Sequence, residues 1–373
     1  MAGLLRAWQE SSFECFCDSG ADYIRRYIQY NAYMPGELME HEISEIPGIF
    51  EKLLDDRSTF ITVGKYLNSK SIHSVLILAR GTSDNAAHFL KYLIETQLGL
   101  PVGLTSPSSV TLYNSKLHFE GVLVVALSQS GQSPDLVAYA KSAMAAGASL
   151  ISLTNDANSP LAKSSNFHVD LQAGPEIAVA ATKSYAAQLL ASYLIVCAWK
   201  GVKPDSEDLV QSSSQLLEVD FSDSVEACDI QDEIVVLGRG FSYPNARETA
   251  LKIQETNKVS VQGLSTADYM HGPISALSPR TQVFFLAPTR MPSNSMDESV
   301  QRIRNMGAKI FWLGGGAQVQ AGEKFIGGSS INNEIVASIA DAVLLQRFVL
   351  ALCLKNSMDP DSPQGLSKVT RTY

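Results

Sequence analysis

The sequence predicts an α/β protein of two tandem domains, each with a parallel sheet covered by helices on both faces. Two observations lead to this prediction. Short runs of aliphatic and β-branched residues alternate with longer segments of helical periodicity, which is the pattern of successive βαβ units. The alternation stops at a polar stretch, residues 201–224, and then starts again. With 373 residues, 45% hydrophobic and 18% charged, the chain can bury a large core.

In the first half, continuous apolar runs are typical of strands buried on both faces. The strands expected there are Ser74–Ala79, Val122–Leu127, Leu150–Leu153 and Phe167–Leu171. Apolar residues at helical spacing predict the intervening helices, which are Asp84–Gln97, Pro134–Ala146 and Thr182–Trp199. An earlier helix is expected over 37–54.

After the polar stretch, which we expect to be the linker, the same order of elements returns. Apolar runs predict strands at Glu233–Leu237, Gln282–Leu286 and Lys309–Leu313. Helical spacing predicts Tyr243–Lys258, Ser293–Met306 and a long closing helix, Ile335–Lys355. Residues 1–33 lack a clear strand pattern, and they are either an extra helix or an extension upstream of a start at Met34.

The return of the pattern is an internal repeat. Residues 75–83 align with 234–242 at an offset of 159, from Gly81 to Gly240, and residues 147–153 align with 307–313 at an offset of 160, from Gly147 to Gly307. Two segments that agree within one residue indicate a duplicated unit. The copies differ where a ligand would lie, because the serine-rich loop at 128–133 corresponds to Ala287–Arg290, which has far fewer donors. We therefore expect one phosphate site, in the first half.

The loop after the apolar run 121–127 is the strongest signal of function. Ser128, Ser130 and Ser133 surround one glycine, and Pro134 then begins a helix. A hydroxyl-rich turn at a helix N-terminus offers free N–H groups, hydroxyl donors and the positive end of the helix dipole to an anion. Because no lysine follows the glycine, this is not the phosphate loop of nucleotide triphosphatases. The loop favours a phosphate monoester, and an ordinary polar turn is the alternative.

Composition excludes several classes of partner. The formal net charge of −9 argues against nucleic acid or an anionic membrane surface. No apolar run reaches transmembrane length and no basic, apolar leader is evident, so a soluble cytoplasmic enzyme or sensor is expected. The five cysteines are scattered. Cys15 and Cys17 have no partner at zinc-ligand spacing, which favours a pair of free thiols.

Six motifs, in this order, make the chain similar to a known family. They are Gly81–Ser83, Ser128–Ser133, Glu176–Lys183, Leu251–Glu255, His271–Pro273 and Leu366–Thr370. The chain resembles the double sugar-isomerase (SIS) domain proteins, above all the isomerase half of glucosamine-6-phosphate synthase and the SIS-type glucosamine-6-phosphate deaminases. The resemblance implies a flavodoxin-like αβα sandwich in each half and a homodimer. We expect an extension at 1–33, SIS domains at 34–205 and 206–358, and a catalytic tail at 359–373.

Carried over by position, the resemblance implies a set of phosphate- and sugar-binding residues. They are Thr82, Ser83, Ser128, Gln129, Ser130 and Ser133. Thr82 and Ser83 also suit capping of the helix that follows, which is compatible with ligand binding. The family often has a hydroxyl residue where this chain has Ala181, which leaves Val179 as the nearby backbone contact.

The resemblance also implies the base of the reaction. Glu255 matches the carboxylate that moves a proton between C1 and C2 of an open-chain sugar phosphate. Without the motif it would be one more solvated glutamate on an amphipathic helix. Glu248 is a weaker candidate, since it can pair with Lys252 at i, i+4.

Two further catalytic residues follow from the resemblance. His271 lies in a tight loop, and an imidazole titrating near neutrality suits opening of the sugar ring. In the family this histidine reaches the neighbouring subunit's site, so the active site is expected to be shared within a homodimer. Lys368 matches a lysine of the C-terminal loop that closes over the sugar and can form a Schiff base or hold a hydroxyl. Lys183 is expected to be structural.

The synthases carry a glutaminase domain before the SIS pair, and here residues 1–33 are too few to form one. The leading prediction is therefore conversion of glucosamine 6-phosphate to fructose 6-phosphate and ammonia, without a metal or organic cofactor. Alternatives are galactosamine-6-phosphate deamination, a deglycase on fructosamine-type phosphates, plain aldose–ketose isomerisation, and glutamine-independent aminotransferase chemistry. A non-catalytic phosphosugar sensor is the last alternative, and it could dispense with Glu255, His271 and Lys368.

Overall fold

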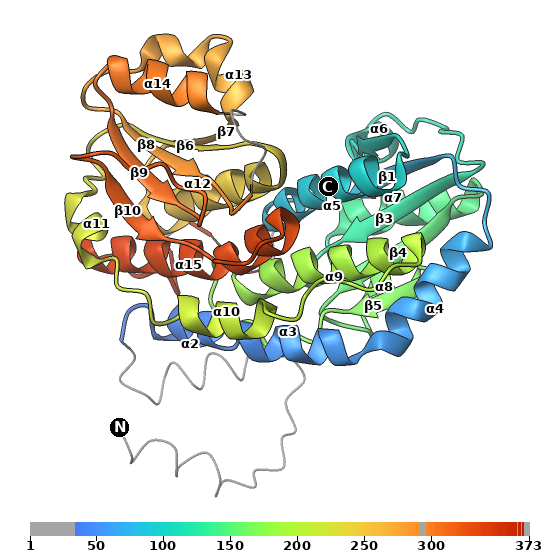
Figure 1. The fold of residues 1–373 in the computed structure, drawn as a ribbon. Helices are drawn as coiled ribbons and strands as arrows, with labels where there is room; N and C mark the ends of the chain where they lie inside the picture. The colour runs from blue at the N-terminus through green and yellow to red at the C-terminus, as the bar shows by residue number, and fades with distance from the viewer. Residues whose placement is uncertain (1–33, 291–295, 364, 367, 369–373) are drawn as a thin grey trace, which may run out of the picture.

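The computed structural model describes residues 34–290, 296–363, 365, 366 and 368 (Figure 1). The expectations for residues 1–33, including the thiols of Cys15 and Cys17, lie outside the described residues. The described chain forms two sheets that lie side by side, with long helices between and around them (Figure 1).

The first sheet has five parallel strands in the order β2-β1-β3-β4-β5. Their bounds are β1 Ser74–Leu78, β2 Val102–Leu104, β3 Val122–Leu127, β4 Ser149–Thr154 and β5 Phe167–Asp170. Every residue of the central strand β3 is buried, as its unbroken apolar sequence predicts.

The second sheet repeats this order. Its parallel strands are β6 Ile234–Gly238, β7 Val261–Ser265, β8 Gln282–Leu286, β9 Lys309–Leu313 and β10 Lys324–Gly327. They are ordered β10-β9-β8-β6-β7. Counted from the β7 edge, the order is β7-β6-β8-β9-β10, which corresponds strand by strand to β2-β1-β3-β4-β5 of the first sheet. The order 2-1-3-4-5 is the flavodoxin-like arrangement. The predicted repeat and fold class are thus confirmed.

Four long helices form the middle of the molecule. They are α5 Thr82–Leu98, α9 Lys183–Lys200, α12 Tyr243–Asn257 and α15 Glu334–Lys355. Helix α5 packs on α9 in the first half, α12 packs on α15 in the second, and α5 contacts α12 across the boundary. One hydrophobic core therefore runs through both halves, and smaller cores lie on the outer face of each sheet.

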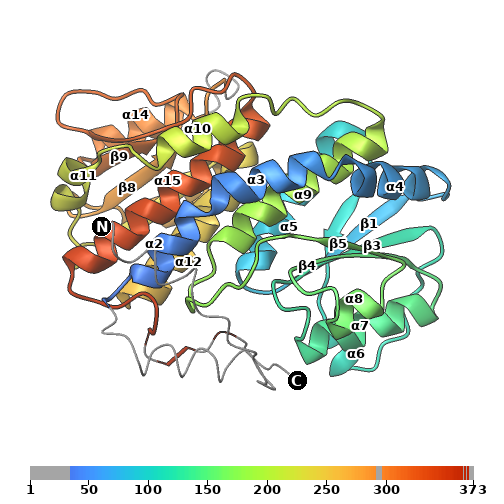
Figure 2. The ribbon, with the colours of Figure 1, turned by 90° about the horizontal axis from the view of Figure 1, so that it is seen from below.

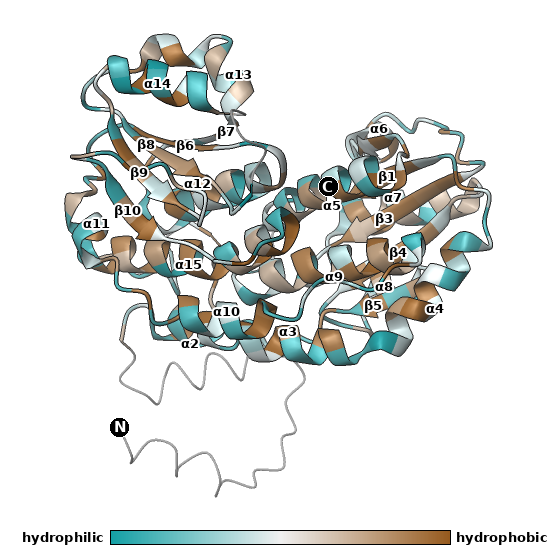
Figure 3. Cartoon of the chain, viewed as in Figure 1, coloured by the Kyte–Doolittle hydropathy of each residue, from teal (hydrophilic) through white to brown (hydrophobic). Residues whose placement is uncertain are grey.

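The remaining helices cover the outside. They are α2 Glu37–Ser44, α3 Ile46–Asp55, α4 Arg57–Asn68, α6 Ser108–Thr111, α7 Pro134–Ala145, α8 Pro160–Lys163, α10 Leu209–Leu216, α11 Ser222–Ala227, α13 Thr266–Met270 and α14 Asp297–Asn305. Helices α2 and α3 run across the underside, where α3 packs on α9 and α10 (Figure 2). Strands are coloured as hydrophobic, whereas α4 and α14 carry many hydrophilic residues (Figure 3).

Two expectations about the helices are wrong. The segment 37–54 forms two helices, because Pro47 cannot continue α2: it has no N–H to donate, and its ring would clash with the carbonyl of Ile43. Helix α2 therefore ends, and α3 begins with Pro47 in its first turn. The polar stretch 201–224 is more than a linker, because it contains α10, which packs on α3 and α15.

Helix α15 is the one described helix long and apolar enough, by length and composition, to cross a membrane. The sequence expectation that no run reaches that length was therefore too strict. In the fold, 83% of the apolar window of α15 is buried against the rest of the protein, as in the core helix of a globular domain.

Candidate active site

A cavity of about 380 Å³ lies at the carboxyl ends of β1 and β3. In a sheet of this order the chain leaves β1 and β3 in opposite directions, and this switch point is where such folds bind ligands. The cavity is lined by Arg80, Gly81, Thr82, Ser83, Ser128, Gln129, Ser130, Ser133, Leu136, Val179, Ala181, Ser184, Lys252, Glu255, Leu366 and Lys368. All of the predicted site residues except His271 are in this set.

The serine loop is built to leave its hydroxyl protons free. Ser128 Oγ accepts a hydrogen bond from the N–H of Gly131 at 3.0 Å, and Ser130 Oγ accepts one from Gln132 at 3.3 Å. Ser133 is the N-cap residue of α7 and makes no capping bond with its side chain. Because each serine hydroxyl has one proton to donate, these contacts leave the protons available to an anion.

Gly131 gives the loop its shape. It has a φ of 61°, and a Cβ at this position would strike Ser159 Oγ. Glycine is therefore required both by the backbone conformation and by the close approach of the neighbouring loop.

The loop after β1 forms the facing side of the cavity, and it corrects one expectation. Helix α5 begins at Thr82 after Gly81, so Thr82 and Ser83 are its first residues and neither is the cap. Thr82 Oγ1 donates to Glu248 Oε1 at 3.1 Å, and Ser83 Oγ accepts from Gln188 at 2.9 Å. Thr82 thus joins the first half to α12 of the second half, and Ser83 joins α5 to α9 within the first half.

Helix α12 supplies the carboxylates. Lys252 forms ion pairs with Glu255 and, at 3.6 Å, with Glu248. Burial pulls the pKa of Lys252 down, but the two carboxylates outweigh burial and raise it, so the lysine stays charged. Burial raises the pKa of Glu248, which also accepts a bond from Asn85 at 2.8 Å. The predicted i, i+4 pair of Glu248 with Lys252 is present.

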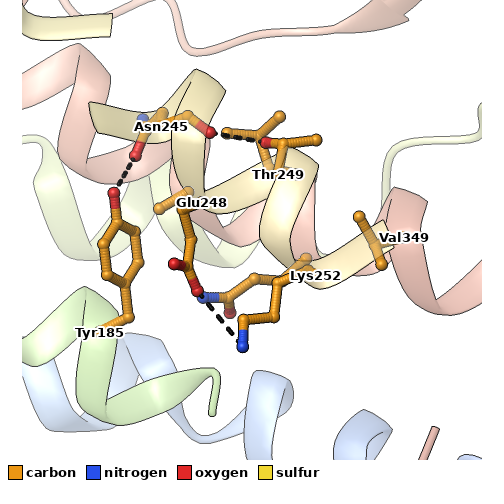
Figure 4. Close-up of a pocket in the computed structure, with 9 residues that line it drawn as sticks. Tyr185, Asn245, Glu248, Thr249, Lys252 and Val349 are labelled. Atoms are coloured by element: carbon orange, nitrogen blue, oxygen red, sulfur yellow. Dashed lines mark hydrogen bonds and ion pairs between the residues drawn. The ribbon is translucent and has the colours of Figure 1, made fainter. Parts of the chain in front are cut away.

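Figure 4 shows the surroundings of the Glu248–Lys252 ion pair. Glu248 and Lys252 project toward each other from α12, and Tyr185 of α9 points at Asn245, to which it donates a bond of 2.9 Å. A cavity of about 10 Å³, the size of one water, lies beside them. Glu255 is the more accessible carboxylate, with 22% of its side chain exposed against 4% for Glu248. Of the two, Glu255 is the one that faces the large cavity.

The C-terminal tail brings a second lysine. Lys368 Nζ donates to Glu176 Oε2 at 3.0 Å and to the carbonyl of Ala178 at 2.7 Å. Glu176 also accepts bonds from Thr182 and Ser184. Burial raises the pKa of Glu176, but Lys368 and the Ser184 bonds together lower it, so it is an ionised partner for the lysine.

Two charged residues of the cavity wall, Arg80 and Lys252, were missed as candidates from the sequence. Lys252 was read only as a partner of Glu248. Arg80 was seen only as part of the repeat, which has arginine at both positions. Its Nε donates to Asp135 Oδ2 at 3.0 Å, and 51% of its side chain is exposed. Asp135 is buried in the first turn of α7, so this pair connects the β1 loop to the serine loop.

The other predicted residues are placed as follows. His271 follows α13 in the second half, is exposed, and does not line the cavity. Val179 lines it, but its N–H is bonded to Asp361 O at 3.3 Å. Lys183 is buried, pairs with Glu45, and does not line the cavity, which agrees with a structural role. Within the described residues no group of three or more His, Cys, Asp or Glu could hold a metal ion.

The match to a known protein family falls into two segments, one for each sheet. The SIS domain family matches residues 69–198 and 230–325. The chain is 26% identical over 339 residues to glutamine–fructose-6-phosphate aminotransferase [isomerizing] of Methanothermobacter thermautotrophicus, which covers 88% of this chain and 56% of that protein. For the Pyrococcus horikoshii enzyme of the same name the identity is 30% over 306 residues, with coverages of 79% and 51%. The chain spans about half the length of these relatives.

Solved structures match over nearly their whole length. A candidate phosphosugar isomerase from Silicibacter pomeroyi superposes with a TM-score of 0.78 at 30% identity, covering 87% of this chain and 99% of that one. Glucosamine-6-phosphate deaminase from Thermotoga maritima superposes with a TM-score of 0.72 at 20% identity, covering 90% and 100%. The second likeness shows the shared fold alone.

Proposed function

Since the chain belongs to the SIS domain family, we propose that it is a phosphosugar isomerase that deaminates glucosamine 6-phosphate to fructose 6-phosphate and ammonia. One observation carries the proposal: a hydroxyl-rich anion cradle and an accessible carboxylate, Glu255, line the same cavity. A sensor needs the cradle only, whereas an isomerase needs a base within reach of the bound sugar.

The phosphate is proposed to bind where Ser128, Ser130 and Ser133 meet the N-terminus of α7. Their free hydroxyl protons and the helix dipole suit a dianion. Arg80 adds a positive charge at the wall of the cavity and is held there by Asp135. Binding at this end directs the reacting end of the sugar toward α12, from which Glu255 projects.

Glu255 is proposed to carry the proton. In the open-chain amino sugar, C1 is an aldehyde carbon and C2 bears the amine. The carboxylate takes the proton from C2, leaving an enolamine, and returns it to C1, which leaves an imine at C2. Water adds to that carbon and ammonia departs, giving the ketose. Lys252, paired with Glu255, supplies a positive charge beside the developing negative charge.

Ring opening suits a histidine, and the described lining residues of this chain's own cavity include none. His271 is the residue proposed for it, supplied by a second copy in a homodimer, because the His271 of the same chain lies outside the cavity. Lys368 is proposed to contact the sugar from the tail. Location in the cytoplasm is part of the same proposal.

The test is ammonia release from purified protein incubated with glucosamine 6-phosphate, with fructose 6-phosphate followed by a coupled assay. Equal amounts of both products support the proposal. Thermal stabilisation by the same sugar without turnover would instead favour a sensor or an enzyme acting on a close analogue. Absence of both turnover and binding would show that the sugar is wrong.

A further inference from the structure

Helix α2 begins without a cap of its own. Its N-cap residue is Gly36, which has a φ of 85° and no side chain to accept a hydrogen bond. The first N–H groups of a helix need acceptors from elsewhere. Asp361, near the other end of the chain, provides them: its carboxylate accepts bonds from Leu38 at 3.2 Å and Met39 at 2.7 Å. A negative charge at this position also suits the helix dipole.

Asp361 is bonded to the cavity wall as well. Its main-chain carbonyl accepts the N–H of Val179, a lining residue of the cavity, at 3.3 Å. Only 5% of Asp361 is exposed. The start of the tail is therefore held between α2 on one side and the cavity wall on the other. Figure 2 shows the tail leaving the end of α15 and passing α2.

Helix α2 has a second contact with the same wall. Glu42, buried on its inner side, accepts bonds from the N–H groups of Ile177 and, at 3.1 Å, Ala178. The carbonyl of Ala178 in turn accepts the bond from Lys368. One helix thus fixes both the beginning of the tail, through Asp361, and the backbone to which the lysine of the tail is bonded.

We propose that α2 positions Lys368 at the cavity, with Asp361 and Glu42 as its positioning residues. A lysine outside any helix or strand has many conformations, and ordering it costs entropy that these fixed contacts reduce. The inference rests on the proposed function for what the lysine does to the sugar. The placement of the lysine itself does not depend on the reaction.

The first test is the accessibility of the Lys368 amine. A short pulse of acetic anhydride labels free amines, and mass spectrometry of the tail peptide reports the rate at Lys368. Asp361→Ala should raise this rate by about fivefold or more, because the tail opens locally. Asp361→Asn, which keeps one acceptor, should give a smaller rise and serves if the alanine variant folds poorly.

Asp56→Ala is the matched control. Asp56 caps α4 through the N–H of Thr59, at 3.4 Å, and α4 contributes no residue to the cavity. This variant loses a helix cap as Asp361→Ala does, but Lys368 should be labelled at the wild-type rate. Equal labelling of Lys368 in wild type, Asp361→Ala and Asp361→Asn would overturn the proposal.

The second test is a double-mutant cycle on turnover. Asp361→Ala should lower kcat by about tenfold through misplacement of the lysine, and KM should change less than twofold. In a Lys368→Met background the same substitution should have no further effect, because the positioned group is gone. An equal loss in both backgrounds would overturn the proposal. If the wild type shows no turnover, the proposed reaction has failed, and the labelling result still decides this inference.

Discussion

The two halves share a strand order but differ at the carboxyl ends of their central strands. In the first half, the ends of β1 and β3 border a cavity of about 380 Å³. In the second half, the chain fills the corresponding place with its own groups. Ser242 Oγ lies 2.9 Å from the carbonyl oxygen of Arg239 and 3.0 Å from that of Leu286, and the Glu334 carboxyl is bonded to the backbone of Phe241.

A glycine loop completes the closure in the second half. After β9, residues 314–316 pack directly on the end of β8, where the N–H of Gly316 donates to Ala287 O at 2.9 Å. A side chain at Gly314 would strike the Ala287 backbone. The fold therefore provides a switch point twice. The loop residues decide whether it becomes a binding site, and among the described residues the serine-rich copy is the one that borders the cavity of about 380 Å³.

The largest effect on turnover is expected at Glu255, a residue of the second half that lines the cavity of the first half. Glu255→Gln keeps the shape of the side chain but cannot take a proton, so turnover should fall on the order of 10³-fold. Sugar-phosphate binding, measured by calorimetry, should be retained. Glu207→Gln, which breaks the exposed pair with Lys203, is the control and should change neither. Substantial activity in Glu255→Gln would show that another group is the base.

The two halves should behave alike in a second experiment, because each buries a carboxyl whose pKa burial raises to about 7. These are Glu42 and Asp341. Both groups stabilise the fold when protonated. That stabilisation is complete below their unfolded pKa values of 4.5 and 3.8 and is lost as pH rises through 7.

Glu42→Gln and Asp341→Asn should therefore each flatten the fall in unfolding free energy between pH 4 and pH 8, by roughly 3–4 kcal/mol. Urea unfolding across this range measures it. Variants that keep the full pH dependence of the wild type would show that these carboxyls titrate normally.

Two serines should show the contrast between the halves most directly, with smaller effects. Ser133 makes no capping bond, so Ser133→Ala should leave stability unchanged and raise KM for the sugar phosphate about tenfold through a lost bond to a charged group. Ser242 is buried, and its hydroxyl is hydrogen-bonded to the backbone of Arg239 and Leu286. Ser242→Ala should therefore lower the unfolding free energy by about 1–3 kcal/mol and leave KM unchanged. The reverse pattern would mean that the binding site lies in the second half.

The sequence was sufficient for the central strands. The bounds of β3, β8 and β9 agree with the prediction, because buried apolar residues make up all of β3 and all but the first residue of β8 and β9. The edge strands β2, β7 and β10 were missed. They are short, partly exposed, and contain Gly103, Gly263 and Gly327, which weaken any strand pattern.

The candidate site was predictable only in part, because some of its residues are brought together only by the fold. The serine loop is local, so its residues reveal it. Arg80 and Lys252 are placed at the cavity through ion pairs that form in the fold. Arg80 pairs with Asp135, 55 positions further along the chain, and Lys252 pairs with Glu255, one helix turn away. Glu176 begins one of the six motifs, but nothing local in the sequence indicates its burial or its bond to Lys368, 192 positions away.

The cap on α2 has a consequence for biosynthesis. Leu38 and Asp361 are 323 positions apart, so a chain emerging from the ribosome contains α2 long before it contains the carboxylate that caps this helix. Until then the first N–H groups of α2 lack this acceptor and the cavity wall lacks the tail. The wall of the candidate site can therefore be completed only after Asp361 has been synthesised, and a chain that terminates before this residue would leave that wall without its contact to the tail.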